Sequence, residues 1–393
     1  MTNVLSKSNR RLTINEIVIV LLVLSACTSV FAIAGIIALL PLYALFSGQG
    51  KKLLPTNMSD YFLLTFALIA ILATAFNAHP ATVNGFVIRP LYLYLLSVMV
   101  LELCFDIYFF RAIITPRAFL LGCDLTVVMS ILCFFVAQAQ KVLRLYPDPI
   151  NRPGRVASLF QNENYYAAFA VMALLCACFR FYTSQVKWQR IVCFTAIFLN
   201  FLGIWYAQSR TALVVAVASL LLYLVIDRKK SAYIIGAVIL FYLIYAMFDT
   251  RVFPRFDAIR DEFSYRAGIW RVALYAFCDH FLLGGGYFSY AFAWTRHMNE
   301  GLYFALHAHE LYLEILMNFG IFGAVSLFSF SAYTARRAFI SVKENRALLA
   351  LLSSLLFSVL LQGLMDTTIL WPQTGFFLVF FFISPRVLKE VQD

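Results

Sequence analysis

Charged residues are scarce in this chain. Asp, Glu, Lys and Arg make up 13% of its 393 residues, whereas 62% of them are hydrophobic. Soluble globular domains carry about 25% charged residues, so the composition disfavours a soluble protein with a large core. We expect a polytopic membrane protein of all-α fold, because helices satisfy every backbone hydrogen bond within the bilayer.

Cysteines that could form disulfides or bind a metal are also lacking. The eight cysteines lie almost entirely within apolar runs and have none of the spacings typical of metal ligands. They are typical of small core residues. We therefore predict no disulfide framework and no metal site among the cysteines. We also expect no cofactor elsewhere in the chain.

Acidic residues are outnumbered by basic ones, 20 against 31, which gives a formal net charge of +11. In a soluble protein this excess would suggest a nucleic-acid partner. In a membrane protein it is explained by basic loops that hold the cytoplasmic side. We therefore expect membrane lipids around the chain and no nucleic acid.

Long apolar runs dominate what is present. A membrane-spanning helix needs about 20 apolar residues, and twelve segments approach that length. They are residues 14–31, 32–48, 60–78, 87–105, 116–138, 164–182, 189–208, 211–227, 231–248, 311–335, 347–366 and 369–386. Basic residues precede the first segment, but no polar stretch follows a plausible cleavage site, so we expect an uncleaved first helix. The sequence thus predicts one integral membrane domain, residues 1–393, with about twelve transmembrane helices.

The basic residues give the expected orientation. With both termini in the cytoplasm, 19 of the 31 Lys and Arg residues fall on the cytoplasmic side, as the positive-inside rule requires. All but one of the remaining twelve are arginines, and arginine grips phosphate in a bidentate manner. Two long outer loops result, 139–163 and 249–310. In the second, Ile269–Phe277 is amphipathic and is expected to lie on the membrane surface.

One polar cluster stands at the start of a long apolar segment, in the stretch Tyr303–Gly323. His307 and His309 lie there, followed by Glu310. Ionisable groups beside hydrocarbon are costly and indicate a functional site. One histidine suits a general base that accepts a hydroxyl proton, and Glu310 could orient it. A zinc site would need three or four ligands at fixed geometry, which this spacing does not specify.

Arginines on the predicted outer side are the candidates for an anion site. Arg210 lies between two apolar spans, where the alternative is a guanidinium that snorkels to the headgroups. Arg266 lies where the second outer loop turns apolar, with Arg271 five residues later. The arginines from 251 to 260 alternate with acidic residues and are typical of a solvated, self-paired face. Arg155 in the first outer loop is a further substrate-binding candidate.

Two polar positions flank other spans. Asp366 lies at the outer end of the eleventh span, where we expect it to pair with an arginine or to line a polar cavity. Asn162 and Asn164 open the sixth span. They are either ordinary helix caps or hydrogen-bonding groups for a sugar, and we count Asn164 among the substrate-binding candidates.

These residues resemble the O-antigen ligase and polymerase superfamily of polysaccharide assembly. The likeness extends over about residues 150–375: AQSRTALVV before an apolar run, then R-x-x-x-W, then the histidine that heads LYLEILMNFGIFG. The LHAHE segment, the compact length and the GLMD-x-x-I-x-W stretch favour the lipopolysaccharide O-antigen ligases. The chain departs from the family in having Glu310 after His309, where Asn is frequent.

The resemblance implies a membrane-embedded glycosyltransferase of the GT-C-like type in the bacterial inner membrane, with 249–310 as a large periplasmic loop that carries part of the active site. Such ligases transfer a glycan from undecaprenyl diphosphate to a sugar hydroxyl of lipid A-core on the periplasmic face. Carried over residue by residue, Arg210 and Arg266 hold the diphosphate and His309 is the base. A single base displacing in line predicts inversion, without a metal.

Two alternatives remain at this point. One is an O-antigen polymerase of the same superfamily, which joins repeat units to each other. The other is a transporter of lipid-linked glycans, a class that commonly shows internal repeats and helices broken near the membrane midplane. The chain has no internal repeat, and its ionisable cluster lies at the predicted outer face, which favours an enzyme.

Overall fold

The computed structural model describes residues 12–33, 57–77, 82–83, 86–87, 115–147, 154–230, 259–297 and 307–382, with isolated positions among 35–55 and 234–241. Regular structure in these ranges is almost entirely helical. The helices are α1 (Ile14–Thr28), α3 (Met58–Phe76), α5 (Pro116–Leu143), α6 (Glu163–Thr183), α7 (Lys187–Tyr206), α8 (Arg210–Ile226), α10 (Ile259–Asp279), α11 (Ser289–His297), α12 (Leu311–Val342), α13 (Arg346–Gly363), the 3-10 turn η4 (Thr368–Leu370) and α14 (Pro372–Phe382). Two short strands, β1 (Thr82–Val83) and β2 (Phe86–Val87), pair antiparallel.

Six of the described helices are long and apolar enough to cross a membrane, namely α3, α5, α6, α7, α12 and α13. Three more, α1, α8 and α14, are apolar but shorter. These nine helices correspond to nine of the twelve predicted spans. The other three, 32–48, 87–105 and 231–248, lie largely outside the described residues. The described part is therefore a polytopic, helical membrane protein.

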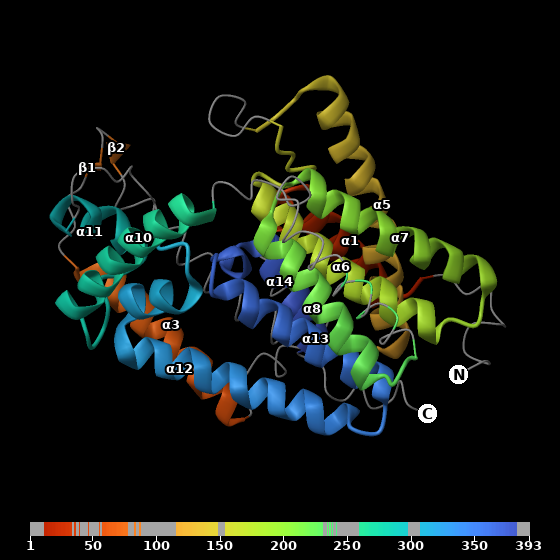
Figure 1. Ribbon diagram of the computed structural model, residues 1–393. Helices are drawn as coiled ribbons and strands as arrows, with labels where there is room; N and C mark the ends of the chain where they lie inside the picture. The colour runs from red at the N-terminus through yellow and green to blue at the C-terminus, as the bar shows by residue number, and fades with distance from the viewer. Residues whose placement is uncertain are drawn as a thin grey trace.

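Helix α6 is the centre of the larger helix group (Figure 1). It packs against α5, α7, α8 and α13, and nearly every residue along it is buried. Its many alanines and cysteines permit this, because small side chains let helices approach closely in a membrane. Near its end, the Arg180 guanidinium binds both carboxylate oxygens of Asp124 on α5, at 2.5 and 3.0 Å. Burying this charge is tolerable because it is paired and bidentate.

Helix α12 is broken at Gly320, which differs from the continuous span that its apolar sequence predicts. Gly320 has φ +63° and ψ −171°, a region that essentially only glycine occupies. The segment 281–286 satisfies the backbone groups that the break frees. The N–H groups of Gly285 and Gly286 donate to residues 317 and 318, and those of residues 321 and 322 donate to 281 and 282, over 2.8–3.2 Å. Broken helices persist at membrane depth only where such partners exist.

The segment predicted to form the second outer loop contains two helices, α10 and α11, gathered beside α3 and one end of α12 (Figure 1). One face of α10 is apolar and buried, with Ile269, Val272 and Ala276 packed around Tyr290 and Trp294 of α11. The expected amphipathic pattern of Ile269–Phe277 is therefore present. Its buried face contacts protein, and the 281–286 segment fixes the end of α10 to the break in α12.

Candidate functional site

The two histidines lie in a tight turn that leads into α12. His309 has φ +51°, an uncommon left-handed conformation for a residue with a side chain. The buried carboxylate of Glu314, one turn into α12, accepts a hydrogen bond of 2.7 Å from the backbone N–H of Ala308. Its other oxygen accepts 2.8 Å from the amide of Asn318. These contacts determine the path of the backbone between the two histidines.

Glu310 caps α12 and does not orient the base. Its carboxylate accepts a hydrogen bond from the backbone N–H of Leu313, which satisfies one of the free donors at the start of the helix. Burial raises the pKa of Glu310, while the N–H groups of Leu313 and Tyr312 act in the opposite direction. The expected contact between Glu310 and His309 is thus replaced by a capping bond.

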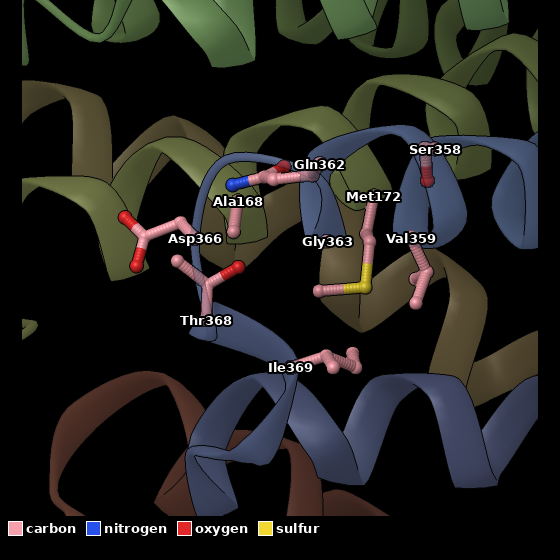
Figure 2. A pocket seen from close by; sticks show the side chains of 9 residues that line it. All are labelled: Ala168, Met172, Ser358, Val359, Gln362, Gly363, Asp366, Thr368 and Ile369. Atoms are coloured by element: carbon pink, nitrogen blue, oxygen red, sulfur yellow. The ribbon is translucent and has the colours of Figure 1, made fainter. Parts of the chain in front are cut away.

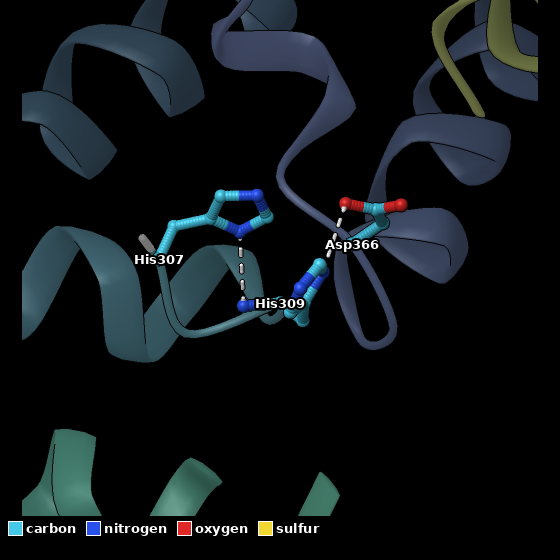
Figure 3. Close-up of side chains that lie close together, drawn as sticks. All are labelled: His307, His309 and Asp366. Atoms are coloured by element: carbon cyan, nitrogen blue, oxygen red, sulfur yellow. Dashed lines mark hydrogen bonds and ion pairs between the residues drawn. The ribbon is translucent and has the colours of Figure 1, made fainter. Parts of the chain in front are cut away.

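His307 and His309 face each other with ring centroids 4.0 Å apart. The backbone N–H of His309 donates to Nδ1 of His307 over 3.3 Å (Figure 3). An accepting Nδ1 assigns the proton of a neutral imidazole to Nε2. His307 therefore supports the turn, and this bond uses only the backbone of His309, so that the His309 imidazole can contact another residue.

That partner is Asp366, whose Oδ1 lies 3.9 Å from Nδ1 of His309. Figure 3 shows the carboxylate approaching the His309 ring from the turn after α13. The separation is that of an ion pair, longer than a direct hydrogen bond. Burial acts to raise the pKa of Asp366, but His309, with smaller effects from His307 and the N–H of Thr367, holds it down at about 2. Asp366 is therefore an anion beside the imidazole.

Asp366 is not paired with an arginine, contrary to the expectation from sequence. Its Oδ2 accepts a hydrogen bond of 2.7 Å from the side-chain amide of Asn164, and its Oδ1 accepts one from the N–H of Thr367 over 2.8 Å. The arginine is one step further away. Arg155 donates to the amide oxygen of Asn164 over 2.9 Å, so the guanidinium reaches Asp366 only through Asn164.

Arg155 also joins two helix ends. Its Nε donates to the carbonyl of Ala207, at the corner between α7 and α8, over 3.0 Å. Its Nη1 lies 3.3 Å from the carboxylate of Glu163, in the first turn of α6. The cap of α6 is as expected: the Asn162 side chain accepts from the N–H of Asn164 over 2.8 Å. Arg155, Asn164, Asp366 and His309 thus form one connected chain of polar contacts.

The other three arginines are placed differently. Arg266 on α10 donates to the carbonyl of Met365, directly before Asp366. Arg210 begins α8 and is half-buried, three residues after the Ala207 carbonyl that binds Arg155. Arg271 is exposed, and five residues along α10 turn it about 140° away from Arg266. The structure therefore brings Arg155 and Arg266 to the cluster. Arg210 lies at the start of α8, near the Ala207 corner that Arg155 also contacts, and Arg271 lies outside the cluster.

Three possible metal ligands occur here, because atoms of His307, His309 and Asp366 lie within 4.8 Å of one another. Several of these atoms already have protein partners. Nδ1 of His307 and both oxygens of Asp366 accept hydrogen bonds. A closed zinc site also uses four ligands as a rule. The arrangement fits an acid–base pair better than a metal centre.

The residues that support this cluster from behind were not predicted from the sequence. Glu314 is a carboxylate inside an apolar run, which was a usable signal. Its partner Asn318 and the Ser289 hydroxyl, which donates to Asn318 over 2.9 Å, gave none, because neither residue stands out from its sequence. The buried amide of Gln362 and the stack of Tyr165 on Trp371, with centroids 4.9 Å apart, were also not predicted.

The fold and this cluster define a polytopic membrane protein with an imidazole–carboxylate pair and guanidinium groups gathered at its helix ends. Residues 194–328 match the family model described as O-antigen ligase, a match that bears out the resemblance stated from the sequence. The matched segment includes Arg210, Arg266 and His309, and ends before Asp366. A comparison with curated proteins gives no match.

Proposed function

We propose that this protein is a glycosyltransferase that joins a glycan from undecaprenyl diphosphate to a sugar hydroxyl of lipid A-core. The contact between His309 and Asp366 supports this most directly, because it supplies an oriented base next to an anion held in a fixed position. The match to the O-antigen ligase family supports the class of reaction.

His309 acts as the general base in this proposal. With Nδ1 turned toward Asp366, the proton of the neutral ring belongs on Nδ1, which leaves the lone pair of Nε2 for the acceptor hydroxyl. Asp366 is a positioning residue that holds the imidazole and stabilises the imidazolium formed when the proton is taken. Catalytic contacts are often long in the absence of substrate and tighten in the complex, which is consistent with 3.9 Å.

The step balances without a further reactant. The acceptor oxygen attacks the anomeric carbon as its proton passes to His309, and the bond from that carbon to the diphosphate oxygen breaks. The diphosphate leaves on its lipid carrier with the extra negative charge. Arg210 and Arg266 are proposed to stabilise that charge, because guanidinium groups bind phosphate oxygens in a fixed geometry. One displacement inverts the anomeric configuration.

We also propose a membrane topology for the protein. The chain would have about twelve spans in a GT-C-like arrangement, with both termini in the cytoplasm and 249–310 as a periplasmic loop that contributes to the active site. The site would then face the periplasm of the inner membrane. Lipid-linked donors are required there, since nucleotide sugars are cytoplasmic.

A transfer reaction with purified protein tests the proposal. The protein is incubated in nanodiscs with a defined undecaprenyl diphosphate-linked glycan and lipid A-core, with and without a chelator. We expect a lipid A-core product of inverted configuration that forms equally well with chelator. Extension of the donor glycan by further repeat units instead would identify a polymerase. Transport into vesicles with no glycan product would contradict an enzyme.

A further inference from the structure

A buried carboxylate, that of Glu314, lies behind the proposed base and has no part in the proton transfer itself. Glu314 is 5% exposed and lies in the first turn of α12. Its Oε2 accepts a hydrogen bond of 2.7 Å from the backbone N–H of Ala308, which is fully buried. Because Ala308 is the residue between the two histidines, Glu314 holds the backbone directly beside His309.

The histidine turn needs such a contact because its backbone is strained. His309 has φ +51°, a left-handed conformation that a residue with a Cβ keeps only where its surroundings enforce it. The N–H of Ala308 donates to Glu314, and the N–H of His309 donates to Nδ1 of His307. Loss of the bond to Glu314 would let the turn relax, and the His309 imidazole would move with its backbone.

Asp366, the other member of the pair, is held independently of this turn. Its backbone N–H donates to the carbonyl of Gln362 over 3.0 Å, and its carboxylate is bound by the amide of Asn164. Figure 2 shows Asp366 on the chain between Gln362 and Thr368. The space that these side chains line measures about 10 Å³, room for about one water molecule. Since Asp366 is fixed, its separation from His309 depends on the histidine turn.

The second oxygen of Glu314 extends the contact to α11. Its Oε1 accepts a hydrogen bond of 2.8 Å from the side-chain amide of Asn318. The amide oxygen of Asn318 accepts from Ser289, the first residue of α11, over 3.2 Å from the backbone N–H and 2.9 Å from the hydroxyl. A backbone N–H can only donate, so the Asn318 amide has its NH2 group toward Glu314. Position 314 therefore needs two acceptors, which a carboxylate supplies and a single amide does not.

We propose that Glu314 is a positioning residue that fixes the His309 ring beside Asp366 through the backbone of the turn. Asn318 fixes the Glu314 side chain and joins it to α11. This inference rests on the proposed function, because His309 is the base of that reaction. It also states a chemical requirement: one acceptor toward the turn, and hydrogen bonds between positions 314 and 318 that run in a consistent direction. A carboxylate and an amide exchanged between these two positions would meet the same requirement.

Removing the Glu314 carboxylate tests the contact with the turn. Glu314→Met keeps a similar volume but leaves the N–H of Ala308 without its acceptor, so we expect that amide hydrogen to exchange about tenfold faster or more. We expect kcat to fall by about tenfold to a hundredfold, because a misplacement of about 1 Å costs that much. Glu314 is proposed to touch neither substrate, so both KM values should stay within about twofold of wild type.

Ser130→Ala is the matched control. It removes a buried side-chain hydrogen bond of 2.9 Å that Asn200 donates between α7 and α5, away from the cluster. We expect kcat to stay at the wild-type value. A loss of kcat that followed merely from weaker helix packing would appear in this variant too.

Exchanging the two side chains tests the direction of the hydrogen bonds. Asn318→Asp alone sets a second carboxylate against that of Glu314, so we expect a loss of kcat similar to that of Glu314→Met. In Glu314→Gln/Asn318→Asp the introduced amide oxygen can accept from Ala308, its NH2 group can donate to the introduced carboxylate, and Ser289 keeps an acceptor. We expect kcat within about threefold of wild type for this double variant. The comparison does not require Glu314→Met to fold.

The outcomes separate this inference from the proposed function. Wild-type kcat in folded Glu314→Met, or unchanged exchange of Ala308, would overturn the positioning role. A double variant no more active than Asn318→Asp would overturn the required direction of hydrogen bonding. Absence of product from wild type, with Ala308 exchange fast in Glu314→Met and slow in the double variant, would contradict only the proposed function.

Discussion

The side-chain amide of Asn164 donates a hydrogen bond of 2.7 Å to the carboxylate of Asp366, although 202 positions separate them in the chain. Asn164 lies in the first turn of α6, the most buried of the six described spanning helices, and Asp366 lies in the turn after α13. The bond leaves Oδ1 of Asp366 on the side of His309. A rigid central helix therefore sets the position of the carboxylate that accompanies the base.

Replacing Asp366 by Asn tests this role. The amide can still accept from Asn164 but carries no charge to stabilise an imidazolium, and it can present a donor to Nδ1 of His309. We expect transfer to fall by about 10²–10⁴ in kcat, the range that general base catalysis supplies. Asp279→Asn is the control, because its carboxylate pairs with His297 and Arg296 outside the cluster. Transfer by Asp366→Asn at the control's rate would count against the positioning role.

The low pKa of Asp366 predicts how acid affects stability. Its pKa is about 2 in the folded protein, below the ordinary value of about 3.9 in an unfolded chain. The ionised form thus stabilises the fold above about pH 4, and this contribution is lost as pH falls through about 2. The difference in thermal stability between wild type and Asp366→Asn should shrink across that window. A difference that stays constant from pH 5 to pH 2 would argue against a depressed pKa.

Lysine should not replace the arginines of the cluster. Arg266→Lys and Arg210→Lys keep a positive charge but lose the planar fork that binds phosphate oxygens. We expect donor turnover, kcat/KM for the lipid diphosphate, to fall by tenfold or more (about 1.4 kcal/mol per factor of ten). Arg271→Lys on the same helix is exposed and should remain near wild type. Equal turnover by all three variants would rule out a guanidinium site at positions 210 and 266.

Gly320→Ala should damage the fold more than another glycine substitution in an apolar segment. A Cβ at position 320 would collide with backbone atoms of Leu282 and Gly284, and φ is +63°. Such strain costs about 1–3 kcal/mol and would push segment 281–286 off the break. We expect lower thermal stability and lower transfer. Gly35→Ala meets no atom within 4 Å, so equal effects of the two substitutions would contradict this account.

Much of the helical framework follows from apolar runs, because a spanning segment must be long and uncharged whatever its neighbours are. Helices α3, α5, α6, α7 and α13 lie close to the predicted segments. The break at Gly320 was not predictable, since it depends on backbone groups of 281–286 that reach α12 through the tertiary fold. The sequence identified amphipathic character in Ile269–Phe277 without indicating that α11 covers that face.

The site residues were recognisable individually, because ionisable groups stand out in an apolar chain. The sequence did not indicate which of these residues contact one another. Glu310, adjacent in sequence, was the natural partner for His309, yet it caps α12 because the first turn of a helix leaves its N–H groups free. Asp366 reaches the imidazole only because α13 ends beside α12. Arg155 reaches Asp366 through Asn164. This contact was also not predictable, because the spacing of residues along the sequence does not show which helix ends meet in the fold.

The most direct test is transfer of glycan from undecaprenyl diphosphate to lipid A-core by the His309→Ala protein in nanodiscs, beside His297→Ala. His297 is the control because it also pairs with a carboxylate, that of Asp279, but lies away from the cluster. We expect His309→Ala to insert, to bind donor and to form no product above about 1% of wild type, in line with the loss of a general base, whereas His297→Ala should transfer normally. Transfer by His309→Ala at the rate of His297→Ala would contradict the role of His309 as the base.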